Sequence, residues 1–147
     1  MSLARLIGRV LLAAIGFLFA CLAAGFVMMA AIGHPGLIAD VPADTPLQPI
    51  NQASAVILTS MITARMAFLP AMIAIVLGEI LSARSVVAHL AAGMVVIVAG
   101  LSVPWPDPTT VPLDTPQAWT MTLAAGAVAG FVYWIIAGRG AGIAPRR

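Results

Sequence analysis

Two charged side chains interrupt an apolar stretch of this sequence, and they are its first candidates for chemistry. Arg65 lies inside the apolar segment 53–81, five residues before Pro70, and Glu79 lies near the end of the same segment. A charge within an apolar span is costly, so such residues commonly mark an ion path, a proton relay or a ligand counter-ion. Arg65 and Glu79 are therefore the candidate functional residues of a polar path.

Arg65 has two interpretations that the sequence leaves open. Along a helix, Arg65 and Arg84 are about 28 Å apart, which nearly matches the roughly 30 Å of a bilayer's hydrocarbon core. In the first interpretation the two arginines mark the two interfaces, and Arg65 extends toward the outer headgroups. In the second, Arg65 faces inward and needs an acidic partner. Glu79 is about 21 Å away on a straight helix, so we expect that partner among the aspartates of two other segments, Asp40, Asp44, Asp107 and Asp114.

Glu79 and the two histidines are best interpreted as interfacial residues. Glu79 either pairs with Arg84 at the membrane surface or binds protons or a cation in a transport path. His34 follows the first apolar segment and His89 begins the third, so the two are predicted at opposite faces, more than about 20 Å apart. They cannot ligate one haem iron, and we expect each imidazole at an interface.

Other patterns typical of catalysis or cofactor binding are missing from the sequence. It has no His/Asp/Ser set on one side, no cluster with metal-ligand spacing and no phosphate loop after a strand. The single cysteine, Cys21, excludes an internal disulfide and is expected as a small buried apolar side chain. We therefore predict a protein that is not an enzyme and binds no metal or cofactor.

The composition predicts that lipid surrounds this chain. Of 147 residues, 62% are hydrophobic and 8% are charged, against about 25% charged residues in soluble domains. The mean hydropathy is +1.09. The net charge is only +2, with seven scattered arginines and no lysine, which does not match the basic patch of a nucleic-acid-binding protein.

Apolar segments predict an all-α, polytopic protein with a single membrane domain over residues 1–147. Spanning the hydrocarbon takes about 20 helical residues, and the third segment qualifies only marginally. The first segment exceeds the roughly 7–15 apolar residues of a signal peptide, so we expect it to be retained. The predicted transmembrane helices cover residues of about 10–32, 53–81, 86–103 and 118–137, joined by proline-rich loops at 33–52 and 104–117.

The arginines predict the orientation. They precede the first helix, lie in the turn between the second and third, and follow the fourth, whereas the two proline-rich loops contain aspartates and no Lys or Arg. Cytoplasmic loops are the ones enriched in basic residues. We expect two hairpins with both termini in the cytoplasm of a bacterium, embedded in its inner (plasma) membrane, with Arg65 as the exception to the rule.

Two phrases recur and suggest an internal repeat. VPADTP at 41–46 matches VPLDTP at 111–116, and LAAGFV at 22–27 matches LAAGMV at 90–95. The offsets differ by two residues, as expected of two parallel copies of a helical hairpin. LAAGAV also occurs in the fourth helix, where the repeat does not predict it, so a chance match in an Ala/Gly-rich chain stays open.

Small residues at helical spacing predict close packing between helices. Gly126 and Gly130 form a GxxxG motif, and Gly16, Ala20 and Ala24 form a similar face in the first helix. With no catalytic pattern, these faces favour an accessory or scaffold subunit that packs against other membrane proteins or a second copy of itself. The alternative is a small transporter or channel component with a polar path near Arg65 and Glu79.

Two longer phrases carry a resemblance to known sequences. FLPAMIAIVLGEILSARS at 68–85 and GFVYWIIAGRGAG at 130–142 resemble patterns in an uncharacterised family of small four-helix membrane proteins from alphaproteobacteria. The second phrase departs from that family at Gly140, where asparagine is often found. The resemblance implies a fold with four membrane helices and no activity, ligand or catalytic residue.

Overall fold

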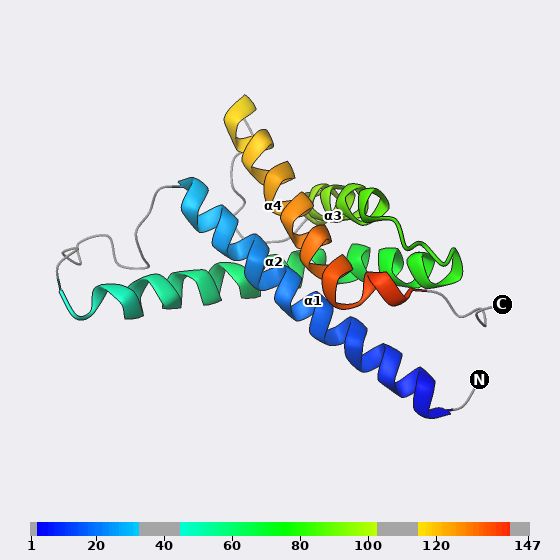
Figure 1. The fold of residues 1–147 in the computed structure, drawn as a ribbon. Helices are drawn as coiled ribbons and strands as arrows, with labels where there is room; N and C mark the ends of the chain where they lie inside the picture. The colour runs from blue at the N-terminus through cyan, green and yellow to red at the C-terminus, as the bar shows by residue number, and fades with distance from the viewer. Residues whose placement is uncertain (1–2, 33–44, 103–114, 142–147) are drawn as a thin grey trace.

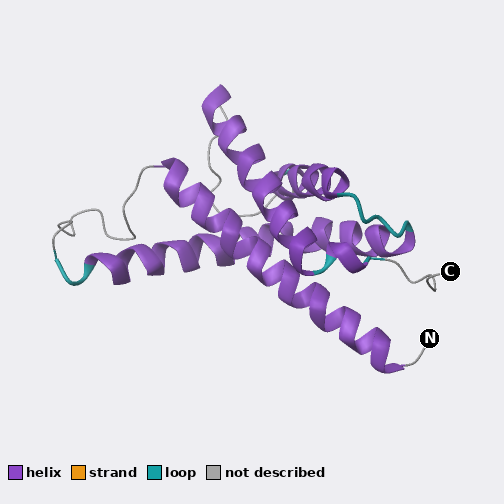
Figure 2. Cartoon of the chain, in the orientation of Figure 1, coloured by secondary structure: helices purple, strands orange, loops and turns teal. Residues whose placement is uncertain are grey.

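The computed structural model describes residues 3–32, 45–102 and 115–141, and this part of the chain is helical apart from short turns (Figures 1 and 2). Its helices are α1 (Leu3–Ile32), α2 (Gln48–Ile80), α3 (Val86–Leu101) and α4 (Pro116–Ile136), followed by the short 3-10 helix η1 (Gly138–Gly140). The all-α prediction is therefore confirmed for the described residues. The aspartates and His34 lie outside them.

Three of these helices are long and apolar enough to cross a membrane: α1, α2 and α4. The fourth, α3, has 16 residues and measures about 24 Å at 1.5 Å per residue, so it falls short of a full span. The helix α2 begins at Gln48, five residues before the predicted span of about 53–81. The early start is compatible with Pro49, which occupies the first helical turn where no donor is needed.

Each of the four helices packs mainly against two others. α1 packs against α2 and α4, and α3 packs against the same two helices. The start of α1, the α2–α3 turn and the end of α4 lie toward the right side of Figure 1.

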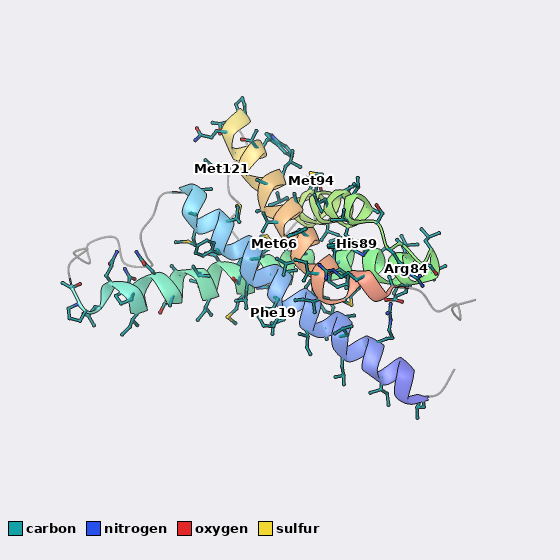
Figure 3. All side chains as sticks on the ribbon, viewed as in Figure 1. Phe19, Met66, Arg84, His89, Met94 and Met121 are labelled. Carbon is teal, nitrogen blue, oxygen red and sulfur yellow. The ribbon has the colours of Figure 1, made fainter. Side chains whose placement is uncertain are left out.

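The interior of the molecule holds small side chains, and the large apolar side chains face outward (Figure 3). The buried apolar residues are alanines and one cysteine, with Ala24 only 1% exposed. The exposed ones include Phe19, Phe26, Leu69 and Val95. A water-soluble protein buries its large apolar side chains, whereas helices in lipid approach one another through small residues.

Glycines set the closest approach of α3 to α4. A Cβ atom placed on Gly93 would lie 2.1 Å from the Gly126 carbonyl oxygen and 2.9 Å from the Gly130 amide nitrogen. A Cβ atom on Gly130 would in turn lie 2.1 Å from the His89 carbonyl oxygen. Because these neighbours are backbone atoms, any larger residue requires the two helices to separate.

The second such contact joins α1 to α2. A Cβ atom on Gly25 would lie 2.2 Å from the Ser60 hydroxyl oxygen and 2.9 Å from its amide nitrogen. The Ser60 hydroxyl donates to the Val56 carbonyl oxygen at 2.6 Å. This hydrogen bond keeps a polar side chain satisfied at a buried helix crossing.

Pro70 lies inside α2 without ending the helix. Proline has no amide hydrogen, so the Met66 carbonyl one turn earlier loses its helical donor. α3 packs at this point through Gly100, where a Cβ atom would lie 3.0 Å from the Met66 oxygen. The missing side chain of Gly100 thus lets α3 approach the freed carbonyl closely.

A left-handed residue ends α2 and directs the chain into α3. Ser82 has φ of 50°, the one positive value among the described non-glycine residues. The amide of Ser82 donates to the Glu79 oxygen at 3.3 Å, and that of Ala83 donates to the Gly78 oxygen at 2.9 Å. This pair of hydrogen bonds is the Schellman motif, which usually has glycine at the left-handed position.

Candidate functional site

An ion pair joins three segments at one end of the molecule. Nη2 of Arg9, in α1, donates to both carboxylate oxygens of Glu79, in α2, at 2.5 and 2.7 Å. Nη1 of Arg9 donates to the carbonyl oxygen of Gly140, just after α4. One guanidinium therefore fastens the start of α1 to the end of α2 and to the tail.

The predicted pairing of Glu79 with Arg84 is replaced by this pair, because Arg84 lies beyond the left-handed turn and its side chain is directed toward the tail. Sequence reasoning missed Arg9 as the partner. The sequence does contain a signal for this pair. In an antiparallel helical hairpin, a basic residue near the start of the first helix and an acidic residue near the end of the second lie at the same depth. We paired Glu79 with the nearest arginine in sequence instead.

Arg84 belongs to a second polar group beside the first. Its Nε donates to the Ala141 carbonyl oxygen at 2.9 Å, and its own carbonyl oxygen accepts a hydrogen bond from the Trp134 indole at 2.8 Å. The Arg139 guanidinium lies over the same indole, 4.6 Å from the ring centroid. We call Arg84, Trp134 and Arg139 the arginine–tryptophan cluster.

His89 is buried among protein side chains at this end of the molecule, and its predicted depth at the membrane interface stays a prediction. The residue is 9% exposed, and its ring stacks on Tyr133 with centroids 5.9 Å apart. Nδ1 lies 2.9 Å from the Ser85 carbonyl oxygen, which can only accept, so Nδ1 carries the hydrogen. Nε2 faces Gly138, where a Cβ atom would lie 2.7 Å away.

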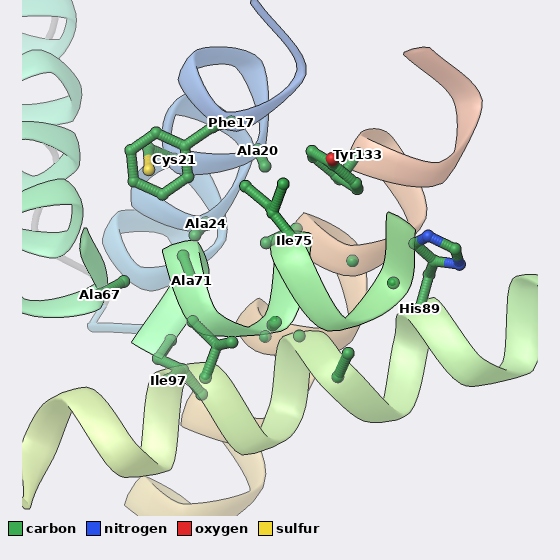
Figure 4. A pocket seen from close by; sticks show the side chains of 18 of the residues that line it. Phe17, Ala20, Cys21, Ala24, Ala67, Ala71, Ile75, His89, Ile97 and Tyr133 are labelled. Carbon is green, nitrogen blue, oxygen red and sulfur yellow. The ribbon is translucent and has the colours of Figure 1, made fainter. Parts of the chain in front are cut away.

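A cavity of about 130 Å³ lies between the four helices and reaches this polar end (Figure 4). Its walls are almost entirely apolar and are built from alanines and glycines of all four helices, with Phe17, Cys21 and Ile75. Glu79, His89 and Tyr133 are its polar side chains at one end. The lining suits a small apolar group.

Arg65 does not belong to this constellation. It is exposed on α2 and is absent from the cavity walls, so the structure does not bring it together with Glu79. This placement agrees with the interpretation in which Arg65 extends outward, and the predicted aspartate partners lie outside the described residues. In the described part of the chain, the cavity is lined by Glu79 and not by Arg65.

The predicted packing residues are buried at helix contacts. Gly16, Ala20 and Ala24 face the interior from α1, and a Cβ atom on Gly16 would lie 3.1 Å from the Tyr133 ring. Gly126 and Gly130 face α3. Cys21, next to Ala20 in α1, is also buried. Both small-residue faces are thus used inside the chain, which leaves the outer, large-residue faces for lipid or partner helices.

The polar end of the molecule is rich in groups that bind anions. Within the described ranges, no three His, Cys, Asp or Glu side chains gather as metal ligands. Glu79, the one carboxylate in those ranges, is already bound by Arg9. The remaining polar groups at this end are arginines, an indole, a phenol and the His89 imidazole, and the arginines are the groups that attract anions.

No family model, curated protein or solved structure matches this chain. The resemblance of segments 68–85 and 130–142 to small membrane proteins of alphaproteobacteria therefore stays a prediction.

Proposed function

We propose that this chain is an integral protein of a bacterial inner membrane and that all four helices cross the bilayer. The observation that carries the proposal is the distribution of side chains: small residues fill the interior and large apolar residues cover the outside. Three helices already have the length and hydropathy of a membrane span. The shorter α3 packs tightly on α4, and thinning of the bilayer accommodates a short helix at modest cost.

Both termini and the α2–α3 turn face the cytoplasm in this proposal. Arg9, Arg84 and Arg139 lie at the same end of the described structure, since Arg9 binds Gly140 and Arg84 binds Ala141. Such a gathering of arginines is typical of the cytoplasmic side. The connections that hold the aspartates join the helices at their opposite ends, which supports an outer location for them.

Thiol labelling tests this orientation. In a Cys21→Ala background, Ser82→Cys places one thiol in the α2–α3 turn and Ser102→Cys places one after α3. In intact cells, a membrane-impermeant maleimide should label residue 102 and spare residue 82, and lysed spheroplasts should expose residue 82. Labelling of both positions, or of residue 82 alone, in intact cells would refute the topology.

The role that fits this architecture best is a non-catalytic accessory or scaffold subunit. The cavity is apolar, its carboxylate is neutralised by Arg9, and the internal packing faces are already occupied within the chain. What remains for a partner is the outer surface of large apolar side chains, which suits other membrane helices or a second copy of the chain.

Affinity purification tests the subunit role. A tagged chain extracted from its own membrane in mild detergent should bring down a stoichiometric membrane protein or migrate as a defined oligomer. A matched sample in harsher detergent controls for trapped lipid and micelle size. A chain that always purifies alone and as a monomer would contradict this role while leaving membrane residence intact.

The cavity favours a second candidate, a small transporter or channel component. Glu79 reaches the cavity wall and Arg65 does not, so the polar path of this candidate runs past Glu79. Glu79→Gln should then change flux in proteoliposomes, and Arg65→Ala serves as the matched control at a charged position outside the cavity. Flux that is the same in Glu79→Gln and the parent protein would exclude this candidate.

We also propose that α1–α2 and α3–α4 are copies of one hairpin. α2 starts at Gln48 and α4 at Pro116, and their separation of 68 residues equals the separation of Gly25 from Gly93 in the LAAG phrases. Each of these glycines contacts the backbone of the next helix. An experimental structure that includes 33–44 and 103–114 tests the proposal, because copies require the two segments to follow equivalent paths.

A further inference from the structure

We propose that the arginine–tryptophan cluster binds the phosphate of an anionic phospholipid headgroup. The inference rests on the membrane residence proposed above and adds a ligand to it. It concerns Arg84, Trp134 and Arg139, which lie next to the Arg9–Glu79 pair and take no part in that pair.

The cluster is preorganised around one indole ring. The Trp134 N–H donates to the Arg84 carbonyl oxygen at 2.8 Å, which fixes the ring against the α2–α3 turn. Arg139 stacks on the ring at 4.6 Å from its centroid, and Arg84 is held to Ala141 through Nε at 2.9 Å. Two guanidinium groups from distant parts of the sequence are thus held at the same end of the molecule, Arg139 on the indole and Arg84 on the carbonyl oxygen of Ala141, two residues after Arg139.

Both guanidinium groups keep donors for a ligand. A guanidinium has five N–H donors, and within the described residues Arg84 uses Nε while its terminal nitrogens make no hydrogen bond. Arg139 contacts Trp134 through its face and makes no hydrogen bond in the same part of the chain. Both residues are exposed. Phosphate oxygens match the geometry of such guanidinium edges.

The charge at this position is positive and uncompensated. Glu79, the one carboxylate among the described residues, is bound by Arg9 on both oxygens. Neither Arg84 nor Arg139 has an acidic partner there. An anion therefore gains two attractive charges at the cluster without displacing an existing ion pair.

Apolar side chains next to the cluster favour a lipid over free phosphate. Ile80 and Leu81, just before the turn, are 64% and 73% exposed. Phe131 and Ile135 are exposed on α4 beside Trp134, and the Phe131 ring stacks on the indole with centroids 6.0 Å apart. A phosphate on the arginines would thus place its acyl chains along an apolar surface. Basic pockets near helix ends on the cytoplasmic side are where anionic headgroups bind.

Native mass spectrometry of the full chain tests the site. The protein, in non-ionic detergent, is mixed with equal amounts of dioleoyl phosphatidylglycerol and dioleoyl phosphatidylcholine, and the retained lipids are counted. The parent should retain phosphatidylglycerol preferentially. Since one basic residue contributes about a fivefold preference, Arg139→Gln should lower the preference about fivefold. Arg84→Gln with Arg139→Gln should lower it about 25-fold.

Two controls make the result decisive. Arg65→Gln removes the same charge from an exposed position on α2 away from the cluster and should lower the preference less than Arg139→Gln does. Arg139 makes no hydrogen bond in the described part of the chain, so its variant should keep the parent's circular dichroism and melting temperature. Equal losses in Arg65→Gln and Arg139→Gln, or an unchanged double variant, would overturn the proposal.

Inorganic phosphate separates the two sources of the anion. At millimolar concentration it should leave phosphatidylglycerol retention nearly unchanged, because the lipid also gains contacts for its acyl chains. Full displacement by inorganic phosphate would overturn the lipid assignment. A protein that inserts into membranes but shows no lipid preference would refute this inference alone, whereas a protein that dissolves in buffer without detergent would refute the proposed membrane residence.

Discussion

The two helix pairs of this molecule are held in different ways. Where α3 crosses α4, Gly93 faces Gly126 and Gly130, and the atoms in contact belong to the two backbones. Where α1 crosses α2, Gly25 faces Ser60, and the nearest atom is a side-chain hydroxyl oxygen. A hydroxyl can rotate away from an added methyl group, whereas a helical carbonyl cannot. The α3–α4 contact is therefore the more rigid of the two.

Charge also separates the two pairs. The sequences of α3 and α4 contain no charged residue, whereas α1 and α2 are joined near their ends by the Arg9–Glu79 pair. Helices in lipid gain little from apolar burial against each other, so packing and polar contacts decide their association. We infer that close backbone packing is enough to hold α3 against α4. The α1–α2 contact tolerates larger side chains better at its crossing, and an ion pair adds to its stability.

The largest effect is expected from Gly130→Ala, which breaks the rigid contact. Its Cβ atom would lie 2.1 Å from the His89 carbonyl oxygen, so α3 and α4 must separate. Overpacking of this kind costs about 3 kcal/mol at the upper end of the usual range. Unfolding in mixed detergent micelles measures the loss of stability. Gly8→Ala is the matched control, because no atom lies within 4 Å of its Cβ position, and a similar loss there would contradict the argument.

A smaller effect is expected from Gly25→Ala, which tests the adjustable contact. The methyl group displaces the Ser60 hydroxyl and strains the nearby amide, at a cost of about 1–2 kcal/mol. Adding Ser60→Gly should recover part of that loss by removing the displaced oxygen. The same unfolding assay measures both variants. If Gly25→Ala costs as much as Gly130→Ala, or if Ser60→Gly recovers nothing, the distinction between the two contacts fails.

The helical content was predictable from sequence because apolar runs of membrane-span length leave few alternatives. The start of α2 was not predictable, since the proline-rich stretch before residue 53 looks like a loop. A proline is compatible both with a loop and with the first turn of a helix. The length of α3 was marginal in the sequence and is short in the structure. Helix existence was thus easier to predict than helix ends.

The polar end was only partly predictable, because its contacts join residues far apart in the chain. Arg9 and Glu79 are separated by 70 positions and Arg84 and Ala141 by 57. Local spacing favoured Glu79 with Arg84, and nothing local marks Gly140 or Ala141 as backbone acceptors. The burial of His89 depends on Gly138, whose missing side chain leaves room for the imidazole. Such complementarity is a property of packing and has no short motif.

The ion pair of α1–α2 should have an intermediate effect. Arg9→Gln and Glu79→Gln each leave a partly buried charge without its partner, which should destabilise the protein by about 1.5–3 kcal/mol. The double variant leaves neither charge behind and should lose less than the two single losses combined. A double-mutant cycle in the unfolding assay measures this coupling. Strictly additive losses would show that the pair does not hold the α1–α2 end together.

The smallest effect is expected from Ser82→Gly, which changes the turn that leads from one helix pair to the other. Relief of the left-handed strain on Ser82 favours the folded state by about 1–2 kcal/mol, and the added freedom of glycine in the unfolded chain opposes it by about 0.4–1 kcal/mol. The difference predicts a net gain of about 0–1.6 kcal/mol, centred near 0.8 kcal/mol.

Ser85→Gly is the matched control in the same turn, because Ser85 has φ of −68° and its side chain makes no capping hydrogen bond. This variant carries the entropic cost without the relief of strain, so it should be neutral to slightly destabilising. The rise in melting temperature should therefore appear in Ser82→Gly and not in Ser85→Gly. A loss of stability in Ser82→Gly would mean that the serine makes a contribution beyond its backbone angle. The turn would then have to be counted among the specific contacts that hold α1–α2 against α3–α4.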